Sequence, residues 1–574
     1  MQSAPSKAEM GRRKQVLSSL VTERQCAARS PDSSRPRCTS AALTVRVSSW
    51  LAIAVMIASC AADPLPESSP STAASTVFEQ SPAPRGNDPG TVDDPSTSKI
   101  DASPSAAHGI VVNTAATGVD FDRRLLGTNV PAWLGPERLA SPQMITAARD
   151  SGTSLVRMPG GSWSNSYDWH ACEIRDELGC FWTWAARPSD FIDFLQATEL
   201  SGMWTVSINE SAQQAAALVA FFNGRVGDQR TIGSDRFGVD WGTVDRWATL
   251  RVDGGNPEPL AIDLWEVGNE VYGAKPASGG SGCADFGWEN AWTCDGEEYV
   301  MGNGEHDGFL AIREAMIEVD PEIEVGAVGV SDPTAWANWG NKVIESAGTA
   351  LDFYVAHHYG FDTSPDIVEA LRLPGQAWPT IGPQLRDALG EGTPIAVTEY
   401  NLVARQDGDT TQSMTRAVNM LYIADTIGQL ARAGVSIANQ WTLASGTADS
   451  GTNYGMVDAD SYARFPQFHA VKFWSRAGQV LYPADVSGDL LNVYPTRHDD
   501  GRWTVLMINL GPASRVTLEM TGLSTTRATV ASVGAPNLSS PTVSAPTVRS
   551  VRTTGEALVI EAWSISIVEI DPAR

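Results

Sequence analysis

Apolar runs and segments of helical period alternate along the middle of the chain, between about residues 120 and 480. Short apolar runs predict buried parallel strands, and the longer segments between them predict helices. The strands are predicted at 125–130, 154–158, 204–208, 262–267, 323–328, 353–356, 395–398 and 435–440. The helices are predicted at 142–150, 188–200, 212–222, 308–319, 336–346, 382–389, 416–433 and 467–476. Eight alternating units favour a (β/α)₈ TIM barrel over an open doubly wound sheet, which ordinarily has fewer units.

The C-terminal part has a different pattern. Trp503–Leu510 follows an Asp-Gly turn, and Leu558–Ile570 contains stretches of alternating polar and apolar residues. Strands and turns of this kind are typical of an antiparallel β-sandwich, which is predicted for residues 481–574. Residues 109–480 are assigned to the barrel, although the lone strand predicted at 109–113 could join the sandwich instead.

Residues 1–60 resemble a bacterial export signal. Arg46 precedes the apolar stretch Trp50–Ile57, which is too short to span a bilayer, and the segment ends in Ile-Ala-Ser-Cys at Cys60. This ending resembles the lipobox of bacterial lipoproteins, which implies cleavage before Cys60 and a lipid on its thiol. Residues 61–108 are rich in Pro, Ser and Thr and predict a disordered tether. We therefore expect an exported protein, anchored by lipid at the bacterial cell surface. A plain secretory signal is the alternative.

Four cysteines lie beyond the predicted leader, in two close pairs. One pair is Cys172 and Cys180, and the other is Cys283 and Cys294. Neither pair has the CxxC spacing that is common in metal sites, and an even number of cysteines suits an exported chain. The sequence therefore predicts two local disulfides.

The net charge of the chain is −26. This much negative charge argues against nucleic acid and anionic lipid as partners, because both would be repelled. We expect contact with a membrane only through the lipid anchor. The charge suits a protein whose partner is an uncharged polymer.

Two of the predicted strands end in a glutamate, in the runs LWEVGNE at 264–270 and IAVTEYN at 395–401. A carboxylate at the end of a buried strand is costly unless it has a chemical role. In a barrel, the carboxyl ends of the strands meet at one mouth, where active residues gather. Two carboxylates there are the equipment for breaking a glycosidic bond, so Glu270 and Glu399 are the candidate catalytic pair.

Other strand ends supply amides, a guanidinium group and aromatic rings. The candidates for binding a substrate are Asn129, Arg157, Trp163, Asn269, His357, Tyr359 and Trp441. His357 and His358 are adjacent in one predicted strand, so they point to opposite faces and at most one faces the site. We therefore expect no metal and no other cofactor.

The ordered set of motifs resembles the clan A glycoside hydrolases and, more narrowly, the family 51 α-L-arabinofuranosidases. The resemblance is carried by VRMPGG at 156–161, YDW at 167–169, WATLR at 247–251, WEVGNE at 265–270 and TEYN at 398–401. The family joins a barrel to a C-terminal β-sandwich, so the resemblance covers residues 109–574. It implies an enzyme that acts on polysaccharide or oligosaccharide.

The resemblance also implies how the two glutamates act. Glu399 would be the nucleophile and Glu270 the acid/base of a double displacement that retains configuration. For this role Glu270 would need a pKa raised by apolar surroundings and by the charge of Glu399. Glu266, deeper on the same strand, is expected to be structural.

Supporting roles are implied for the residues around the pair. Arg157 would hold the surroundings of Glu399, and either Tyr359 or His357 would hydrogen-bond to that carboxylate. Asn269 would bind the sugar hydroxyl next to the reacting carbon. Asn129 ends the first strand, and Trp163 and Trp441 could stack on sugar.

The chain departs from the family at two positions that shape the sugar pocket. Ser162 replaces the usual Asn after the paired glycines, and the first strand ends in Asn129 without the usual acidic residue. The sugar therefore stays open: an α-L-arabinofuranosidase is expected, with an endo-β-glycanase, a β-xylosidase or a β-glucuronidase-like enzyme as alternatives. A sugar-binding surface lipoprotein without catalysis is an alternative of another class.

Overall fold

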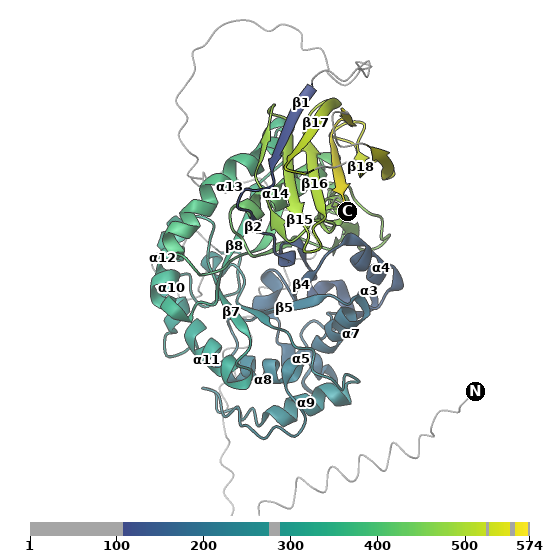
Figure 1. Ribbon diagram of the computed structural model, residues 1–574. Coiled ribbons are helices and arrows are strands. Elements are labelled where there is room, and N and C mark those ends of the chain that lie inside the picture. Colours follow the sequence, from purple (N-terminus) through teal and green to yellow (C-terminus); the bar gives the residue numbers. More distant parts are fainter. Residues whose placement is uncertain (1–106, 275–286, 524–526, 552–556, 572–574) are drawn as a thin grey trace, which may run out of the picture. The chain divides into compact units, whose positions relative to one another are not determined.

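Parallel strands from the middle of the chain close into a barrel (Figure 1). The computed structural model describes residues 107–274, 287–523, 527–551 and 557–571. The strand order around the barrel is β10-β3-β4-β5-β6-β7-β8-β9, and each neighbouring pair is parallel. The strands are β3 (Gly127–Asn129), β4 (Leu155–Met158), β5 (Ser201–Val206), β6 (Leu264–Val267), β7 (Glu324–Val328), β8 (Phe353–Phe361), β9 (Ile395–Val403) and β10 (Ile437–Gln440). The predicted barrel is confirmed.

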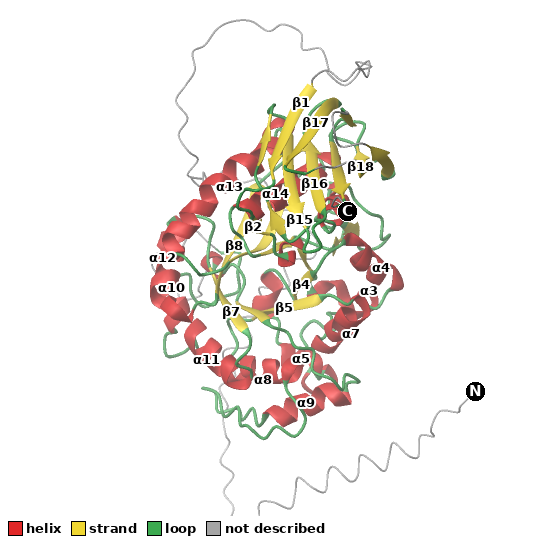
Figure 2. Ribbon diagram, viewed as in Figure 1, coloured by secondary structure: helices red, strands yellow, loops and turns green. Residues whose placement is uncertain are grey.

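Helices surround these strands (Figure 2). They are α3 (Gly135–Leu139), α4 (Pro142–Ser151), α5 (Trp169–Glu173), α6 (Arg175–Leu178), α7 (Pro188–Thr198), α8 (Ala212–Asn223), α9 (Val244–Asp253), α10 (Gly296–Met301), α11 (Phe309–Val319), α12 (Ala335–Ala347), α13 (Ile367–Leu389), α14 (Ala417–Arg432) and α15 (Gln467–Trp474). Local signals fix many of their ends. For example, Pro142 begins α4 and Gly152, in the left-handed region, ends it.

The helices differ from the sequence prediction at several places. α13 begins at Ile367, well before the predicted start at residue 382, although three prolines lie inside it. The N-cap of α13, Asp366, accepts hydrogen bonds from two backbone amides, and the buried side chains of the helix pack on the barrel. These contacts outweigh the unfavourable effect of the three prolines on the helix. α9 (Val244–Asp253) was not predicted, and neither were the shorter helices α3, α5, α6 and α10. None of the described helices is long and apolar enough to span a membrane.

The barrel interior changes from apolar to polar along the strands. Its lower layer is an apolar cluster of Leu155, Met203, Leu264, Phe353, Val355, Ala396 and Ile437. Alternate residues of a strand share a face, so the residues two positions further along the strands form the next layer. That layer holds Arg157, Thr205, Glu266, His357, Thr398 and Asn439, all buried or nearly so. The strand pattern therefore places a polar group of side chains at the carboxyl end.

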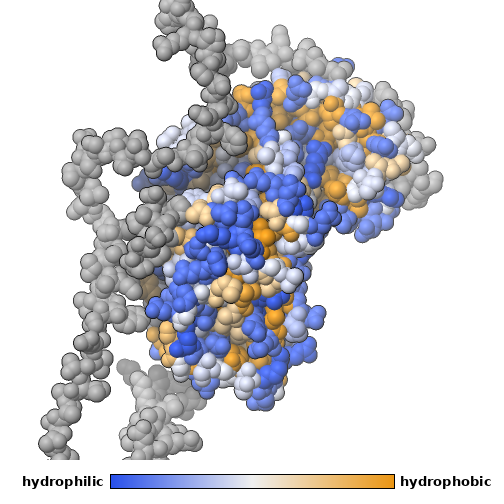
Figure 3. Space-filling view, turned by 90° about the vertical axis from the view of Figure 1, so that its left-hand side faces the viewer, coloured by the Kyte–Doolittle hydropathy of each residue, from blue (hydrophilic) through white to orange (hydrophobic). Residues whose placement is uncertain are grey.

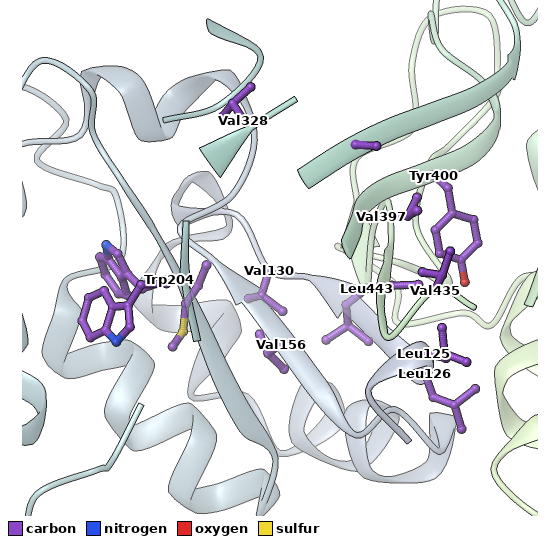
Figure 4. Close-up of a cluster of buried hydrophobic side chains, with 14 of the residues drawn as sticks. Leu125, Leu126, Val130, Val156, Trp204, Val328, Val397, Tyr400, Val435 and Leu443 are labelled. Atoms are coloured by element: carbon purple, nitrogen blue, oxygen red, sulfur yellow. The ribbon is translucent and has the colours of Figure 1, made fainter. Parts of the chain in front are cut away.

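A larger apolar cluster lies between the strands and the helices. Figure 4 shows part of it, with Val156, Trp204 and Val397 labelled among its members. These side chains are on the opposite strand faces from the polar layer. Outside this cluster, polar and apolar residues are interspersed on the face that lies at the left of Figure 1 (Figure 3).

The C-terminal part forms two packed sheets, which confirms the predicted sandwich. One sheet has the order β14-β1-β17-β20 and the other β19-β18-β21-β16-β15-β13-β2. Their strands are β1 (Ala107–Asn113), β2 (Val119–Asp120), β13 (Val480–Leu481), β14 (Ala484–Val486), β15 (Leu491–Arg497), β16 (Trp503–Asn509), β17 (Ser514–Thr521), β18 (Ala528–Gly534), β19 (Thr547–Val551), β20 (Leu558–Ile560) and β21 (Ser564–Ile570). β1, which precedes the barrel in sequence, pairs with β17 and β14 in the sandwich.

Helix α14 joins the barrel to the sandwich through Tyr494 of β15. The Tyr494 hydroxyl donates to the carboxylate of Asp425 and accepts from Gln429, and Arg432 lies 4.5 Å from the ring centroid. The ring lies against Gly428, where a Cβ atom would be only 2.3 Å from Cε1 of Tyr494. Gly428 therefore allows the helix and the sandwich to approach closely.

This close approach predicts opposite effects for two Gly→Ala substitutions in helices. Gly428→Ala should destabilise the protein by about 1–3 kcal/mol, because the added methyl group overlaps the Tyr494 ring. Gly375→Ala in α13 is the matched control: its Cβ would meet only Gln429, at 3.6 Å. That variant should gain up to about 1 kcal/mol from helix propensity. Urea unfolding measures both, and equal effects of the two substitutions would contradict the prediction.

Candidate active site

Arg157, in β4, connects four strands of the barrel mouth. It is fully buried, and it donates to Glu266, which lies one layer below the mouth in β6. Its Nη1 donates to Asn129 Oδ1 and to Glu399 Oε1, both at 2.9 Å. Its Nη2 donates to Asn269 Oδ1 at 2.8 Å. Burial opposes the charge of the guanidinium, but the ion pairs with both glutamates outweigh it and raise the pKa of Arg157.

The two candidate catalytic carboxylates face each other across the mouth. Glu270 lies just beyond β6, and Glu399 lies within β9. A carboxylate oxygen of Glu270, one of Glu399 and a ring nitrogen of His357 all lie within 4.8 Å of one another. This spacing is closer to the roughly 5–5.5 Å between the carboxyl groups of retaining glycosidases than to the roughly 6.5–9.5 Å of inverting ones.

Glu270 is held by three hydrogen-bond donors. Its backbone has φ of 41°, in the left-handed region, which turns the chain sharply after the strand. Its Oε1 accepts from the Tyr272 hydroxyl at 3.0 Å and pairs with His357 Nδ1 at 2.9 Å, and its Oε2 accepts from Trp288 Nε1 at 2.8 Å. Burial raises the pKa of Glu270, but His357 and the other donors outweigh it, so the pKa lies below its ordinary value. This direction is opposite to the expected one.

His357 faces the site and is fully engaged. Nδ1 pairs with Glu270, and Nε2 lies 3.0 Å from Thr398 Oγ1. Burial lowers the pKa of His357, but the charges of Glu399 and Glu270 and the hydrogen bond to Glu270 raise it above its ordinary value. His358 points away and packs on Trp378, with ring centroids 5.2 Å apart.

Glu399 receives a hydrogen bond at each oxygen. Oε1 accepts from Arg157, and Oε2 accepts from the Tyr359 hydroxyl at 2.7 Å. The nearest ring nitrogen of His357 is 3.8 Å from Oε2, so Tyr359 is the hydrogen-bond partner and His357 serves Glu270 instead. The carboxylate is 5 % exposed, so it is held firmly and still open to the mouth.

The cluster of Glu270, His357 and Glu399 is also the set of described side chains that could share a metal ion. Both nitrogens of His357 already have partners, and each carboxylate already accepts from protein donors. The Arg157 guanidinium, which contacts Glu399, would repel a cation. The donor set therefore fits a hydrogen-bonded carboxylate pair better than a metal centre.

The remaining predicted binding residues differ in their access to the mouth. Asn129 is completely buried, with its side chain between Arg157 and the backbone oxygen of Thr398, so the structure places it beneath the pocket. Trp441 is half-buried and lies against Gly161, where a Cβ would be 2.5 Å from its ring. Trp163 is also half-buried, and its ring stacks on Trp182 with centroids 4.4 Å apart.

Glu289 is a carboxylate at the site that the sequence analysis did not single out. It is 6 % exposed and accepts from Ser162 Oγ at 2.6 Å, from Asn165 Nδ2 at 2.7 Å and from Asn269 Nδ2 at 3.0 Å. Burial and the charge of Glu270 raise the pKa of Glu289 to about 8, against these hydrogen bonds. It lies in a loop outside the strand pattern, so only its motif context, next to Trp288, could have pointed to it.

The cysteine prediction is partly confirmed. Cys172 and Cys180 form a disulfide that closes the segment after the second barrel strand. Cys294 is disulfide-bonded. Its predicted partner Cys283 lies outside the described residues, as do Cys60 and the predicted leader.

The fold matches solved structures of glycoside hydrolases. An α-L-arabinofuranosidase from Thermotoga maritima, in an arabinose complex, is similar with a TM-score of 0.63 and 18 % identity, over 80 % of this chain and 99 % of that one. A family 51 α-L-arabinofuranosidase from Thermotoga petrophila has a TM-score of 0.64 and 18 % identity, over 81 % and 100 %. A family 44 xyloglucanase from Paenibacillus polymyxa has a TM-score of 0.54 and 13 % identity, over 81 % of this chain and 100 % of that one. At these identities the likeness shows the shared fold.

Curated relatives narrow the resemblance. An intracellular exo-α-(1→5)-L-arabinofuranosidase from Bifidobacterium longum is 25 % identical over 229 residues, 38 % of this chain and 34 % of that protein. An enzyme of the same name from Halalkalibacterium halodurans is 23 % identical over 249 residues, which are 41 % of this chain and 42 % of that protein. The chain thus spans less than half the length of these relatives. No family model matches the chain. The predicted resemblance to family 51 arabinofuranosidases is confirmed: a solved enzyme of that family shares the fold, and the relatives in sequence are named as arabinofuranosidases.

The same relatives correct the expected localisation. Both are named as intracellular enzymes, which points against an exported protein that is anchored by lipid at the cell surface. The expectation relied on the pattern in residues 1–60 of a basic residue, an apolar stretch and Cys60. Such a pattern is short, so it is also found in proteins that carry no lipid anchor.

The Arg157 contacts predict a large effect on stability. Arg157→Met should lower the free energy of unfolding by about 3–5 kcal/mol, because Glu266 and Glu399 would stay buried without their cation. The matched control is Arg187→Met, which removes an ion pair to Asp190. The Arg187 side chain is 42 % exposed. The control should cost less than about 1 kcal/mol. Urea unfolding of both variants checks this, and a cost for Arg157→Met as small as the control would refute it.

Proposed function

We propose that this protein is a retaining glycoside hydrolase that acts on α-L-arabinofuranosides of polysaccharides or oligosaccharides. The observation that carries the proposal is the approach of Glu270 and Glu399 to within 4.8 Å at the barrel mouth. The curated relatives, named as exo-α-(1→5)-L-arabinofuranosidases, support the choice of sugar.

The reaction has two displacements. The Glu399 carboxylate attacks the anomeric carbon while the bond to the leaving oxygen breaks, and Glu270 gives that oxygen a proton. A covalent glycosyl-enzyme results. Glu270 then takes a proton from water, whose oxygen attacks the same carbon and releases Glu399. Two inversions retain the configuration of the sugar.

The neighbours of the pair support these roles. Arg157 and Tyr359 each donate to one oxygen of Glu399, which fixes the direction of its attack. Asn269 adjoins Glu270 and holds its Oδ1 toward Arg157, so its amide group is placed to bind the hydroxyl next to the anomeric carbon. Trp441 and Trp163, both half-buried, offer ring faces to sugar.

The His357–Glu270 pair supplies the proton. Against the opposing effect of burial, the contact with His357 lowers the pKa of Glu270. The charge of Glu399 and the contact with Glu270 raise the pKa of His357, so the proton resides largely on the imidazole. The two groups are 2.9 Å apart, which allows the proton to pass to Glu270 as the leaving oxygen develops charge.

An endo-β-glycanase is the second candidate. The similar fold of the family 44 xyloglucanase favours it, as does Ser162 at a position where family 51 enzymes usually have Asn. A panel of aryl glycosides separates the candidates: α-L-arabinofuranoside, β-xyloside, β-glucoside and β-glucuronide. Turnover of only the β-glucoside or of β-linked oligosaccharides would replace the arabinofuranoside assignment and keep the mechanism.

Glu399→Gln should abolish hydrolysis of the aryl arabinofuranoside, with kcat reduced at least about a thousand-fold, because the nucleophile is lost. Binding of arabinose should survive, as measured by calorimetry. The control Glu369→Gln changes an exposed glutamate of α13 and should leave kcat unchanged. Equal rates for Glu399→Gln and wild type would remove the assignment, whereas binding without hydrolysis in the wild type would indicate a sugar-binding protein.

The shared proton predicts a shift in the pH profile. In the wild type, kcat/KM falls at high pH when the His357–Glu270 pair loses its shared proton. Two groups that share a proton hold it at least as tightly as either group alone. His357→Gln should therefore move the alkaline limb to lower pH, by about one unit. His498→Gln in the sandwich is the control. A limb that stays in place or moves to higher pH in His357→Gln would contradict proton sharing.

A further inference from the structure

Two consecutive residues, Trp288 and Glu289, contact the two consecutive residues Asn269 and Glu270. The Trp288 indole donates to Glu270 Oε2, and Glu289 Oε1 accepts from Asn269 Nδ2. The backbone amides of Trp288 and Glu289 both donate to the carbonyl of Gly273. The segment that carries them thus runs alongside the loop that carries Asn269 and Glu270.

The surroundings of Glu289 require two acceptor oxygens. Asn165 receives the backbone N–H of Asn269 at Oδ1, 3.0 Å, and its Nδ2 donates to the Asn269 carbonyl at 2.7 Å. The Asn165 amide therefore cannot reverse, and its Nδ2 must face Glu289 Oε2. Ser162 and Asn269 donate to the other oxygen. A glutamine would present an amide group to one of these donors.

Asn269 is fixed from both sides. Its Oδ1 accepts from Arg157, and one hydrogen of its Nδ2 goes to Glu289, which leaves the second Nδ2 hydrogen for the pocket. Without Glu289, the amide would lose the contact that holds its nitrogen toward the mouth. The direction in which Asn269 offers its donor therefore depends on a carboxylate in a different loop.

Trp288 acts on Glu270 in the same way. Its side chain is 46 % exposed and its ring lies against Gly273, where a Cβ would be 2.3 Å away. The indole N–H holds Oε2, while His357 and Tyr272 hold Oε1. Removing the N–H would free one oxygen of the carboxyl group without changing the core.

We propose that Trp288 and Glu289 are positioning residues of the reaction: Glu289 orients the Asn269 amide toward the sugar hydroxyl next to the anomeric carbon, and Trp288 orients the Glu270 carboxyl toward the leaving oxygen. The inference rests on the proposed glycosidase function. It assigns sugar recognition and proton delivery to two adjacent residues of one segment, so each arm has its own kinetic signature.

The role of Glu289 is tested with substrates that carry or lack the sugar hydroxyl next to the anomeric carbon. Glu289→Gln should lower kcat/KM for a 4-nitrophenyl α-L-arabinofuranoside about ten-fold or more, the value of one misplaced hydrogen bond. On the corresponding 2-deoxy furanoside, which lacks the hydroxyl, the variant and the wild type should differ less than about two-fold. Glu298→Gln, a half-buried glutamate of α10 that accepts from Thr293, is the matched control and should match the wild type.

The Trp288 arm is tested with the leaving group. Trp288→Phe should lower kcat/KM about ten-fold for an alkyl arabinofuranoside, which needs a proton on its leaving oxygen, and hardly at all for the 2,4-dinitrophenyl compound, which does not. Trp292→Phe is the control, because that indole donates to the carbonyl of Ile208 instead. Trp288 is half exposed, so this arm remains testable even where Glu289→Gln does not fold.

The outcomes separate two failures. A wild-type protein that hydrolyses none of these furanosides would overturn the proposed function. An active wild type whose Glu289→Gln loss is the same with and without the hydroxyl, and whose Trp288→Phe loss is the same for both leaving groups, would overturn the positioning roles alone. Circular dichroism and thermal unfolding of each variant establish that the folded proteins are compared.

Discussion

The buried charge of Arg157 is the constraint on which the site depends. One guanidinium beneath the barrel mouth donates to Glu266 of the same layer and to Glu399 at the mouth, and it also fixes two amides. Buried ion pairs of this kind add little net stability, because desolvation offsets the attraction. Their value here is geometric, since the planar fork of an arginine holds several partners at set directions. The nucleophile candidate is therefore oriented from the barrel core and does not depend on a loop.

The position of this guanidinium follows from the period of the strands. Apolar residues fill the lower layer, and the same strand faces carry polar residues two positions later. The barrel thus has a dry base that supplies stability and a polar mouth that supplies chemistry. Asn129 illustrates the division: it was expected to contact sugar, but as the last residue of a short strand it stays beneath the mouth as a partner of Arg157.

The sequence predicted what periodicity controls and missed what loops control. All eight barrel strands and both candidate catalytic glutamates followed from apolar runs that end in polar residues. Glu289 lies 19 positions after Glu270 in a segment without periodicity, so no pattern placed it at the site. The pKa of Glu270 was expected to rise, and it falls. Burial is visible in a strand pattern, whereas the contact with His357 and the hydrogen bonds from Trp288 and Tyr272 form only in the fold.

The charges at the mouth suit the cation that would form in the proposed reaction. Glu266, Glu270, Glu289 and Glu399 bring four carboxyl groups, and Arg157 and His357 bring two cations at most. Burial and the charge of Glu270 raise the pKa of Glu289 to about 8, while Ser162, Asn165 and Asn269 donate to its two oxygens and favour its ionised form. In the proposed reaction, the net negative charge would face a sugar ring that becomes oxocarbenium-like, where fixed charges in a dry site act strongly. These charges would stabilise a neutral substrate little and a positively charged transition state strongly, and catalysis depends on this difference.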